Sequence, residues 1–517
     1  MAIQDLANGQ AAAPASDAGG RSGGDDIKAH FVFIPIMFQG HLIPAVDTAL
    51  LLATHGALAT VVVTPSYTSR IRPTIDFAHT SGLPVRLLEL PLDLAAEGLP
   101  AGADDVDKVP PDLWTNYFRA LARLRTPLER QLLADADVAH PVTCVVADFC
   151  HPWAKELAAS LRVPRLCFFS MCAFCLLCQH NVERFGSYDG VADANELVVV
   201  PGLERRVEVS RAQAPGFFRD MPGFEKFGDE VEQALVEADG IVTNSFLEME
   251  PEFVAGYAGA RRMKVWTVGP VSLFHHRTTT TTSASRGNTA AIDADECLMW
   301  LDDKEPSSVV YVSFGSLAQA NSKQVIELGL GLEASGHPFI WVVKNAHQHG
   351  QDVIEFLHEL EGRVAGRGML IRGWAPQVMI LSHVAVGSFV THCGWNSTME
   401  AVAAGLPVVT WPHFADQFLN AKLAVEVLGI GVDVGVTEPV MYRMDLKEIV
   451  VGREVVEKAV RSVMDGGEEG EERRRRARVL AAKARDAVEE GGSSYGNLLD
   501  LVKRFEVDTA GCVVATA

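Results

Sequence analysis

The segment GSFVTHCGWNSTMEAVAA, residues 387–404, joins an apolar strand, a glycine turn and a helix start. Residues 387–391 are typical of a buried strand and residues 398–404 of a helix, with Gly394 in the turn between them. Free backbone N–H groups and the helix dipole make such a junction an anion-binding site. His392, Asn396 and Ser397 add side-chain donors, so the segment predicts a diphosphate site at the carboxyl end of a strand.

The same alternation of strand and helix extends along the chain on both sides of this segment. Apolar runs that we interpret as strands occupy residues 29–36, 58–63, 85–90, 144–147, 166–169, 240–243, 265–268, 309–314, 338–343, 369–371 and 407–410. Continuous apolar strands separated by helical patterns indicate parallel sheets covered on both faces. We therefore predict an α/β protein of two doubly wound, Rossmann-like domains that face each other across a cleft.

The length of 517 residues also suits two domains. A tract with five consecutive threonines at 278–282 offers nothing for a packed element and is typical of a flexible linker. We expect a first domain at 28–273, a linker at 274–294, a second domain at 295–490, a helix at 491–505 that packs back on the first domain, and disordered tails at 1–27 and 506–517.

Composition narrows the classes of partner. The 45 Lys and Arg against 66 Asp and Glu give a net charge of −21, which disfavours nucleic acid and anionic membrane surfaces as partners. We expect no signal peptide, because residues 1–27 show no basic start followed by an apolar core. We expect no integral membrane segment, because the apolar run at residues 166–178, broken only by Ser170, is too short to span a bilayer. Scattered cysteines suit a cytoplasmic protein, which we expect to be a monomer.

Cysteines at 172, 175 and 178 recur every third residue. This spacing has two interpretations, an iron–sulfur or zinc cluster and small apolar residues on a buried helix. The apolar residues around them favour the buried helix.

Two polar residues follow strands in the first half. His41 comes five residues after the first strand, beyond the turn residue Gly40, and Asp148 directly follows residues 144–147. An imidazole can take a proton from an alcohol near neutral pH, and a carboxylate can orient it. Each residue alone also suits a helix start or a cap. Together they predict a catalytic pair.

In the second half, further side chains suit the parts of a nucleotide sugar. Trp374 offers an indole face for a base and Gln377 an amide for its edge, whereas Glu400 can bind two ribose hydroxyls. Each side chain also has a structural interpretation, as core, helix surface or loop. The remaining candidates are Ser316 in a small turn for phosphate, and Asp416 and Gln417 for sugar hydroxyls.

One pattern points to a different nucleotide. Residues 329–334, GLGLEA, match the loose dinucleotide fingerprint, which functions only in a turn between strand and helix. Because this segment falls inside a helical run at 323–333, we favour helix packing over NAD binding.

Residues 374–417 resemble the signature segment of plant secondary-product UDP-glycosyltransferases, the inverting family with the GT-B fold. The matching motifs are WAPQ at 374–377, HCGWNS at 392–397, WP at 411–412 and DQ at 416–417, and the similarity extends over about residues 28–505. The resemblance implies that His41 is the general base and Asp148 its partner. It assigns UDP-sugar contacts to Ser316, Trp374, Ala375, Gln377, His392, Trp395 (mainly through its backbone), Asn396, Ser397, Glu400, Asp416 and Gln417.

The implied reaction moves a hexose from a UDP-sugar to a hydroxyl of a small lipophilic acceptor such as a flavonoid, a terpenoid or another phenolic. A final Gln in the signature, here Gln417, favours glucose. We expect neither a prosthetic group nor a metal. Two alternatives are an NAD-dependent oxidoreductase and a non-catalytic metabolite carrier, although a carrier needs no base.

Overall fold

The computed structural model describes residues 27–134, 140–214, 216, 218, 223–276, 287, 290–315, 321–344, 349–440, 450–465 and 467–506. The expectations for tail residues 1–26 and 507–517, for most of the linker and for Ser316 lie outside these residues.

The first domain is built on a parallel sheet of seven strands in the order β3-β2-β1-β4-β5-β8-β9. Its strands are β1 (Ala29–Ile34), β2 (Ala57–Val63), β3 (Val85–Glu89), β4 (Cys144–Asp148), β5 (Arg165–Phe169), β8 (Gly240–Thr243) and β9 (Val265–Thr267). Every residue of the central strands β1, β4 and β5 is buried. Helices on both faces of a parallel sheet account for this burial and for the apolar runs.

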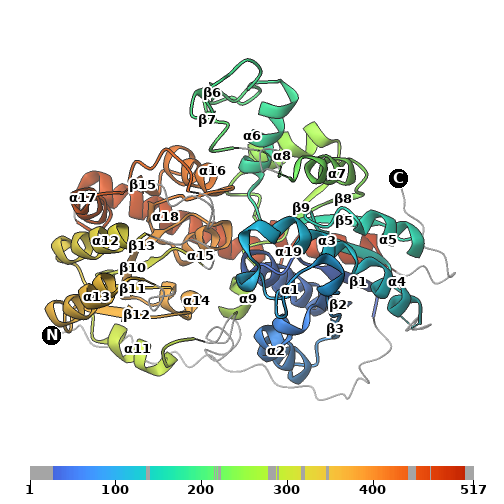
Figure 1. The fold of residues 1–517 in the computed structure, drawn as a ribbon, viewed down its shortest axis with the longest axis horizontal. Helices are drawn as coiled ribbons and strands as arrows, with labels where there is room; N and C mark the ends of the chain where they lie inside the picture. Colours follow the sequence, from blue (N-terminus) through green and yellow to red (C-terminus); the bar gives the residue numbers. More distant parts are fainter. Residues whose placement is uncertain are drawn as a thin grey trace, which may run out of the picture.

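The helices of this domain are α1 (Gln39–Thr54), α2 (Pro65–Thr80), α3 (Trp114–Ala122), α4 (Arg125–Ala134), α5 (Ala154–Leu161), α6 (Ala173–Arg184), α7 (Glu225–Val236), α8 (Pro251–Arg261) and the short α9 (Leu273–His276). A hairpin of β6 (Leu197–Val199) and β7 (Glu208–Ser210) projects at the top of Figure 1. Single helical turns are η1 (Ala95–Glu97), η2 (Val106–Lys108) and η3 (Pro111–Leu113).

The cysteine triplet lies at the start of α6, as the buried-helix interpretation predicts. Cys172 is the N-cap residue, and Cys175 and Cys178 follow inside the helix, all three buried. The eight cysteines in the described ranges are unpaired. No group of three or more His, Cys, Asp or Glu side chains within those ranges is arranged to hold a metal ion.

The second domain has a parallel sheet of six strands in the order β12-β11-β10-β13-β14-β15. Its strands are β10 (Val309–Ser313), β11 (Phe339–Val342), β12 (Gly368–Ile371), β13 (Val386–Thr391), β14 (Val408–Thr410) and β15 (Gly431–Asp433). Its helices are α11 (Ala294–Asp302), α12 (Ser322–Ser335), α13 (Gln351–Arg363), α14 (Gln377–Leu381), α15 (Trp395–Ala404), α16 (Gln417–Lys422), the π-helical turn η5 (Leu423–Val427) and α17 (Arg453–Met464).

The prediction of two Rossmann-like domains is confirmed, and they lie side by side in Figure 1. Gly329 and Gly331 lie inside α12, where added side chains would press against Phe356 and Val456. They serve close helix packing. They do not form the strand-to-helix turn that a dinucleotide fingerprint requires.

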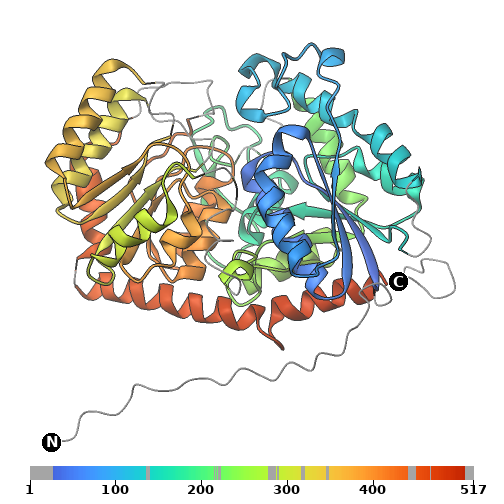
Figure 2. The same cartoon turned by 90° about the horizontal axis from the view of Figure 1, so that it is seen from below.

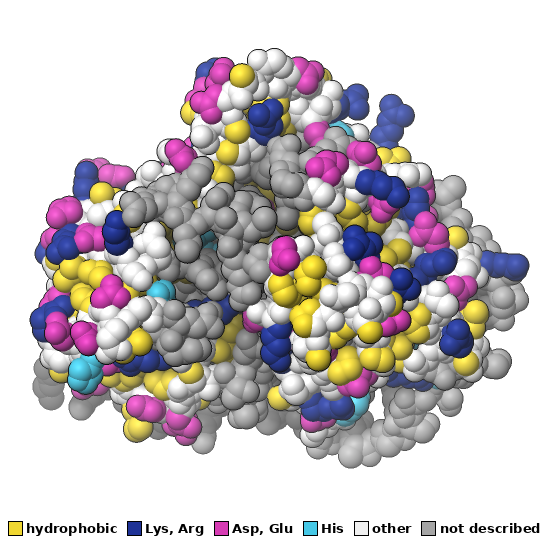
Figure 3. All heavy atoms as spheres, in the orientation of Figure 1, with side chains coloured by type: hydrophobic (Ala, Val, Ile, Leu, Met, Phe, Trp, Pro, Cys, Tyr) yellow, Lys and Arg dark blue, Asp and Glu magenta, His cyan; other side chains and the backbone are white. Residues whose placement is uncertain are grey.

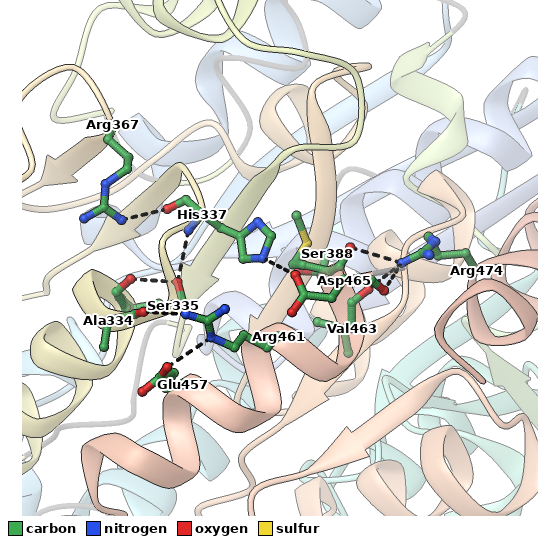
Figure 4. A network of polar contacts seen from close by, with 12 residues as sticks. Ala334, Ser335, His337, Arg367, Ser388, Glu457, Arg461, Val463, Asp465 and Arg474 are labelled. Atoms are coloured by element: carbon green, nitrogen blue, oxygen red, sulfur yellow. Dashed lines mark hydrogen bonds and ion pairs between the residues drawn. The ribbon is translucent and has the colours of Figure 1, made fainter. Parts of the chain in front are cut away.

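A polar network joins helices at the amino-terminal ends of strands in the second sheet (Figure 4). His337, just before β11, contacts Asp465 at 2.9 Å, and Arg461 on α17 donates to the Ala334 carbonyl at 3.0 Å. Arg474 of α18 (Glu468–Val488) donates to the Val463 carbonyl at 2.9 Å. These hydrogen bonds link α17 to the end of α12 and α18 to the end of α17.

The C-terminal helices cross from one domain to the other, as Figure 2 shows in red. Helix α18 packs on α15, whereas α19 (Ser493–Arg504) lies on the first domain. The ring of Phe505 meets Phe31 edge-on with centroids 6.0 Å apart, and the indole of Trp266 donates to Asp500 at 2.6 Å. The last helix thus completes the core around β1 and β9.

The surface in Figure 3 carries basic and acidic side chains interspersed over one face. The net charge of −21 therefore does not gather into a single acidic patch on that face. Within the described part of the chain, every helix is too short or too polar to cross a membrane.

Candidate active site

His41 and Asp148 lie together at the carboxyl ends of two neighbouring strands. Strands β1 and β4 pair in parallel, so the start of α1 after β1 and the last residue of β4 share one edge of the sheet. His41 Nδ1 lies 2.7 Å from Asp148 Oδ2. The Asp148 side chain is fully buried, whereas the His41 side chain is 21% exposed. The imidazole can thus reach a substrate while the carboxylate stays dry.

The electrostatics of the pair suit a base and its orienting partner. Burial lowers the pKa of His41, but the charge and hydrogen bond of Asp148 outweigh it, so the pKa lies above its ordinary 6.5. Burial raises the pKa of Asp148, yet His41 outweighs burial and holds it below 3.8. An ionised Asp148 accepts the Nδ1–H of His41, which leaves the Nε2 lone pair for an incoming hydroxyl.

A second histidine beside Asp148 was not among the sequence predictions. His151 is 2% exposed, and its backbone N–H donates to the Asp148 carbonyl at 2.9 Å. A ring nitrogen bonds the Pro35 backbone, and burial lowers the pKa of His151. Among the residues described, His41 is the histidine whose ring contacts the Asp148 carboxylate. Only the nearness of His151 to Asp148 in sequence could have pointed to it.

Aromatic side chains surround the base on the side of the first domain. The rings of Phe38 and Phe149 lie 5.9 and 6.0 Å from the His41 ring, centroid to centroid. Trp114 stacks on Phe38 at 5.7 Å, and Phe218 lies 6.3 Å from Phe149. Their contribution was missed, because they come from four separate segments. An apolar, ring-shaped molecule would find matching surfaces here.

The segment that opens the sequence analysis folds as predicted, with β13 leading into α15. Cys393 takes a left-handed conformation, φ 64°, in the turn, and Gly394 precedes the helix. Among the described residues, no side chain caps the start of α15. Its first backbone N–H groups therefore remain available to an anion.

His392 lies in the space that two glycines leave open. A side chain at Gly315 or Gly394 would collide with its ring. The ring lies beside the Ser313 backbone, and among the described residues its buried Nδ1 has no hydrogen bond of good geometry. Burial lowers the pKa of His392 to about 3. A histidine ring packed against Gly394, directly before the helix start, is a second feature that suits a diphosphate.

Asn396 and Trp395 at the start of α15 reach into the first domain. Asn396 Oδ1 accepts from Asn244 Nδ2 at 3.2 Å, and Asn396 Nδ2 donates to the Gly40 carbonyl. The indole of Trp395 donates to the Asn244 carbonyl at 2.7 Å. With these side chains engaged, the backbone N–H groups of Trp395 and Asn396 are what the helix start offers to a diphosphate.

The expected nucleoside contacts form one cluster. Gln377 Nε2 donates to Ser397 Oγ at 3.0 Å and to Glu400 Oε2 at 2.8 Å. Glu400 is 8% exposed, so it does not lie on a solvated helix surface. Ala375 is buried, and its carbonyl accepts from the Gln377 N–H at 2.8 Å.

Trp374 lies at the edge of this cluster, between the two domains. Its Nε1 is buried without a hydrogen-bond partner in the described residues. A side chain at Gly287 would come within 2.6 Å of the Trp374 indole and 3.2 Å of Ile43. Gly287 thus packs closely against the indole, and a larger residue at this position would displace it.

The two residues expected to hold the sugar begin α16. Gln417 Oε1 accepts from the His413 and Phe414 N–H groups at 2.9 and 3.2 Å, which turns its NH₂ group away from them. Asp416 Oδ2 accepts from Asn420 Nδ2 at 2.8 Å. Burial raises the pKa of Asp416 to about 6, with nearby His41 among the groups that oppose the shift. This electrostatic coupling indicates that sugar site and base share the cleft.

Two Rossmann-like domains, with a candidate base on one and a candidate anion site on the other, are typical of a nucleotide-dependent transferase of the GT-B class. Residues 289–460 match the family model of UDP-glucoronosyl and UDP-glucosyl transferases. The chain is 42% identical over 491 residues to UDP-glycosyltransferase 73D1 of Arabidopsis thaliana, covering 92% of this chain and 96% of that protein. It is 44% identical over 483 residues to UDP-glycosyltransferase 73E1 of Stevia rebaudiana, with the same coverage.

Solved structures of plant glycosyltransferases also superpose on this chain. Glycyrrhiza uralensis UGT73P12, complexed with glycyrrhetinic acid 3-O-monoglucuronide, superposes with a TM-score of 0.84 at 35% identity, covering 92% of this chain and 96% of that one. Arabidopsis thaliana UGT89C1, complexed with UDP-L-rhamnose, gives a TM-score of 0.70 at 28% identity, covering 92% and 99%. The chain belongs to the plant UDP-glycosyltransferase family and is an enzyme that uses a UDP-sugar.

Proposed function

We propose that the enzyme transfers a hexose, with glucose as the favoured sugar, from a UDP-sugar to a hydroxyl of a small lipophilic acceptor, with inversion. The observation that carries this proposal is the 2.7 Å contact between His41 and a fully buried Asp148, on the edge of the first sheet that meets the start of α15. A flavonoid, a terpenoid or another phenolic would supply the hydroxyl.

In the proposed reaction, His41 Nε2 takes the proton of the acceptor hydroxyl as its oxygen bonds to the anomeric carbon. The bond between that carbon and the UDP oxygen breaks, and UDP leaves with the electron pair. A single displacement from the face opposite UDP inverts the anomeric centre. The N–H groups at the start of α15 and the ring of His392 would stabilise the charge on UDP.

The sugar assignment rests on Asp416 and Gln417. The oriented NH₂ of Gln417 would donate to one sugar hydroxyl, and Asp416 would accept from another. Relatives have been solved with more than one donor, since UGT89C1 is complexed with UDP-L-rhamnose and Phytolacca americana UGT2 with UDP-2-fluoro-glucose. Glucose is therefore a preference that the experiment must compare with other donors.

The acceptor class follows from the aromatic surroundings of His41. The rings of Phe38, Phe149 and Trp114 favour a flat or polycyclic apolar molecule over a charged one. Solved relatives with flat or polycyclic ligands include complexes with quercetin, with pterostilbene and with glycyrrhetinic acid 3-O-monoglucuronide, the last of which also carries carboxyl groups.

The test is a mass-spectrometric screen of phenolic and terpenoid acceptors, quercetin among them, against UDP-glucose, UDP-galactose, UDP-rhamnose and UDP-glucuronate. We expect a product heavier by one hexose with UDP-glucose, and none with the His41→Ala variant. A parallel thermal-shift series compares UDP, UDP-glucose and NADH. Stabilisation by NADH alone would overturn the donor assignment, and UDP binding without transfer to any acceptor would favour the carrier interpretation.

A further inference from the structure

Asn244 of the first domain contacts the start of α15 in the second domain. It directly follows β8, is 2% exposed and uses its backbone and both ends of its side chain. Its Oδ1 accepts from the Val271 N–H at 3.1 Å, and its Nδ2 donates to Asn396 Oδ1 at 3.2 Å. Its carbonyl accepts from the Trp395 indole at 2.7 Å. Its backbone N–H also donates to the Phe169 carbonyl at 3.4 Å, so two of its four hydrogen-bond partners belong to the first turn of α15.

The position of Asn244 is fixed from within its own domain. A side chain at Gly269 would collide with the Asn244 amide oxygen and the Ser245 backbone, so this loop packs closely on Asn244. The Val271 N–H then fixes the orientation of the Asn244 side-chain amide, because only the amide oxygen can accept its hydrogen bond. Asn244 consequently presents its NH₂ group to Asn396 in a single orientation.

The contact continues from Asn396 to the base. Once Asn396 Oδ1 accepts from Asn244, its own NH₂ group points to the Gly40 carbonyl, to which it donates. Gly40 immediately precedes His41 in the first turn of α1. One chain of hydrogen bonds thus links β8, the start of α15 and the turn that carries His41.

We propose that Asn244 is a positioning residue, which orients Asn396 and thereby holds the start of α15 against the Gly40–His41 turn when the domains meet. This inference rests on the proposed role of the α15 start in binding the diphosphate. Without Asn244 the Asn396 amide is free to rotate, and the closed arrangement that surrounds UDP is less populated. Apparent UDP affinity falls with that population.

The experiment is a double-mutant cycle on UDP binding, measured by calorimetry with UDP as the probe. Asn244→Ala removes the side chain and leaves the carbonyl that accepts from Trp395. We expect it to weaken UDP binding about tenfold, as for loss of an interdomain hydrogen bond that leaves a buried group unpaired. In the Asn396→Ala background the same change should cost less than about twofold, since the two residues act as a unit.

Asn244→Asp serves as a second variant, since it keeps an oxygen for the Val271 N–H and removes only the donor to Asn396. The negative charge added by Asn244→Asp weakens UDP binding whether residue 396 is Asn or Ala. We therefore compare the loss of UDP affinity caused by Asn244→Asp in the wild-type enzyme with the loss it causes in Asn396→Ala. The matched control is Asn497→Ala. Asn497 also donates twice, to the Thr267 carbonyl at 2.9 Å and to its Oγ1 at 3.2 Å, but it lies on α19. This control should leave UDP affinity unchanged.

The outcomes distinguish failure of the positioning role of Asn244 from failure of the proposed diphosphate site at the start of α15. Weaker UDP binding in Asn396→Ala with unchanged binding in Asn244→Ala overturns the positioning role alone. Equal losses from Asn244→Ala in both backgrounds also overturn it, because Asn244 then acts independently of Asn396. If Asn396→Ala itself leaves UDP affinity unchanged, the hydrogen bonds through Asn396 do not affect UDP binding and the inference fails, whereas the diphosphate assignment of the backbone N–H groups, which Asn396→Ala keeps, stands.

Discussion

Replacing Asp148 by Asn tests the catalytic pair most directly. The variant keeps the shape of the side chain, but it removes the charge that His41 contacts at 2.7 Å in a fully buried position. A hydrogen bond to a charged group contributes about 1.5–3 kcal/mol, which corresponds to a loss of about 10- to 150-fold in kcat/KM. If the Asn amide also selects the other tautomer of His41, the loss is larger still.

The pH profile of this variant should change in a defined direction. His41 acts as a base only when neutral, so the rate falls as the pH drops through its pKa, which Asp148 holds above 6.5. Without the carboxylate, burial dominates and lowers the pKa of His41. The acid limb of kcat/KM should therefore move to lower pH while the plateau falls.

The assay is UDP release measured across the pH range with an acceptor from the screen. Asp105→Asn is the control, because Asp105 is also buried and pairs with Arg70 at 2.7 Å without contacting His41. It should leave the acid limb in place. Wild-type kcat/KM and an unshifted limb in Asp148→Asn would refute the pairing.

Further predictions concern the base, the diphosphate site, the nucleoside site and the C-terminal helix. His41→Ala should abolish transfer yet keep UDP affinity in calorimetry, and residual transfer at the wild-type rate would exclude His41 as the base. At acid pH, UDP binding should take up a proton, because burial holds the pKa of His392 at about 3 in the ligand-free site and a diphosphate raises it. Calorimetry in buffers of different ionisation enthalpy measures this uptake, which should vanish in His392→Gln. Glu400→Gln should raise the KM for the UDP-sugar about tenfold with little change in kcat, because the Glu400 carboxylate, 2.8 Å from Gln377, would bind ribose hydroxyls in ground and transition states alike. Phe505→Ala should lower the thermal unfolding midpoint, since truncating a buried Phe costs about 3–5 kcal/mol, and an unchanged midpoint would mean that α19 contributes little to the first domain.

The strands were predictable because residues buried on both faces leave uninterrupted apolar runs. Residues 240–243 match β8, whereas the run at 29–36 extends beyond β1, which ends at Ile34 because Pro35 has no N–H for the ladder. Strand β15 and the β6–β7 hairpin were not predicted. Each of their strands has three residues, and Leu197 and Val199 are exposed, so no run distinguishes them from loop.

The contact between His41 and Asp148 was predictable for a topological reason, since both residues lie at the carboxyl ends of strands that meet at one sheet edge. Asn244 offered no such signal. Its importance depends on a contact with Asn396, 152 residues away, and neither residue type nor spacing indicates which asparagine meets which. The aromatic rings around His41 were equally hidden, because they come together only through the fold.

The return of α19 to the first domain affects how members of this family are recombined. A hybrid with a single junction in the linker near residue 287 would take its first sheet from one parent and α19 from the other. The foreign helix would then have to fit Phe31 and Trp266 and supply an acceptor for the Trp266 indole, as Asp500 does here. A second junction between Val488 and Ser493 restores the parental helix to its own sheet. To exchange donor specificity between two such enzymes, one would therefore replace the second domain between both junctions, from near residue 287 to the Val488–Ser493 segment, and keep α19 with its own first domain.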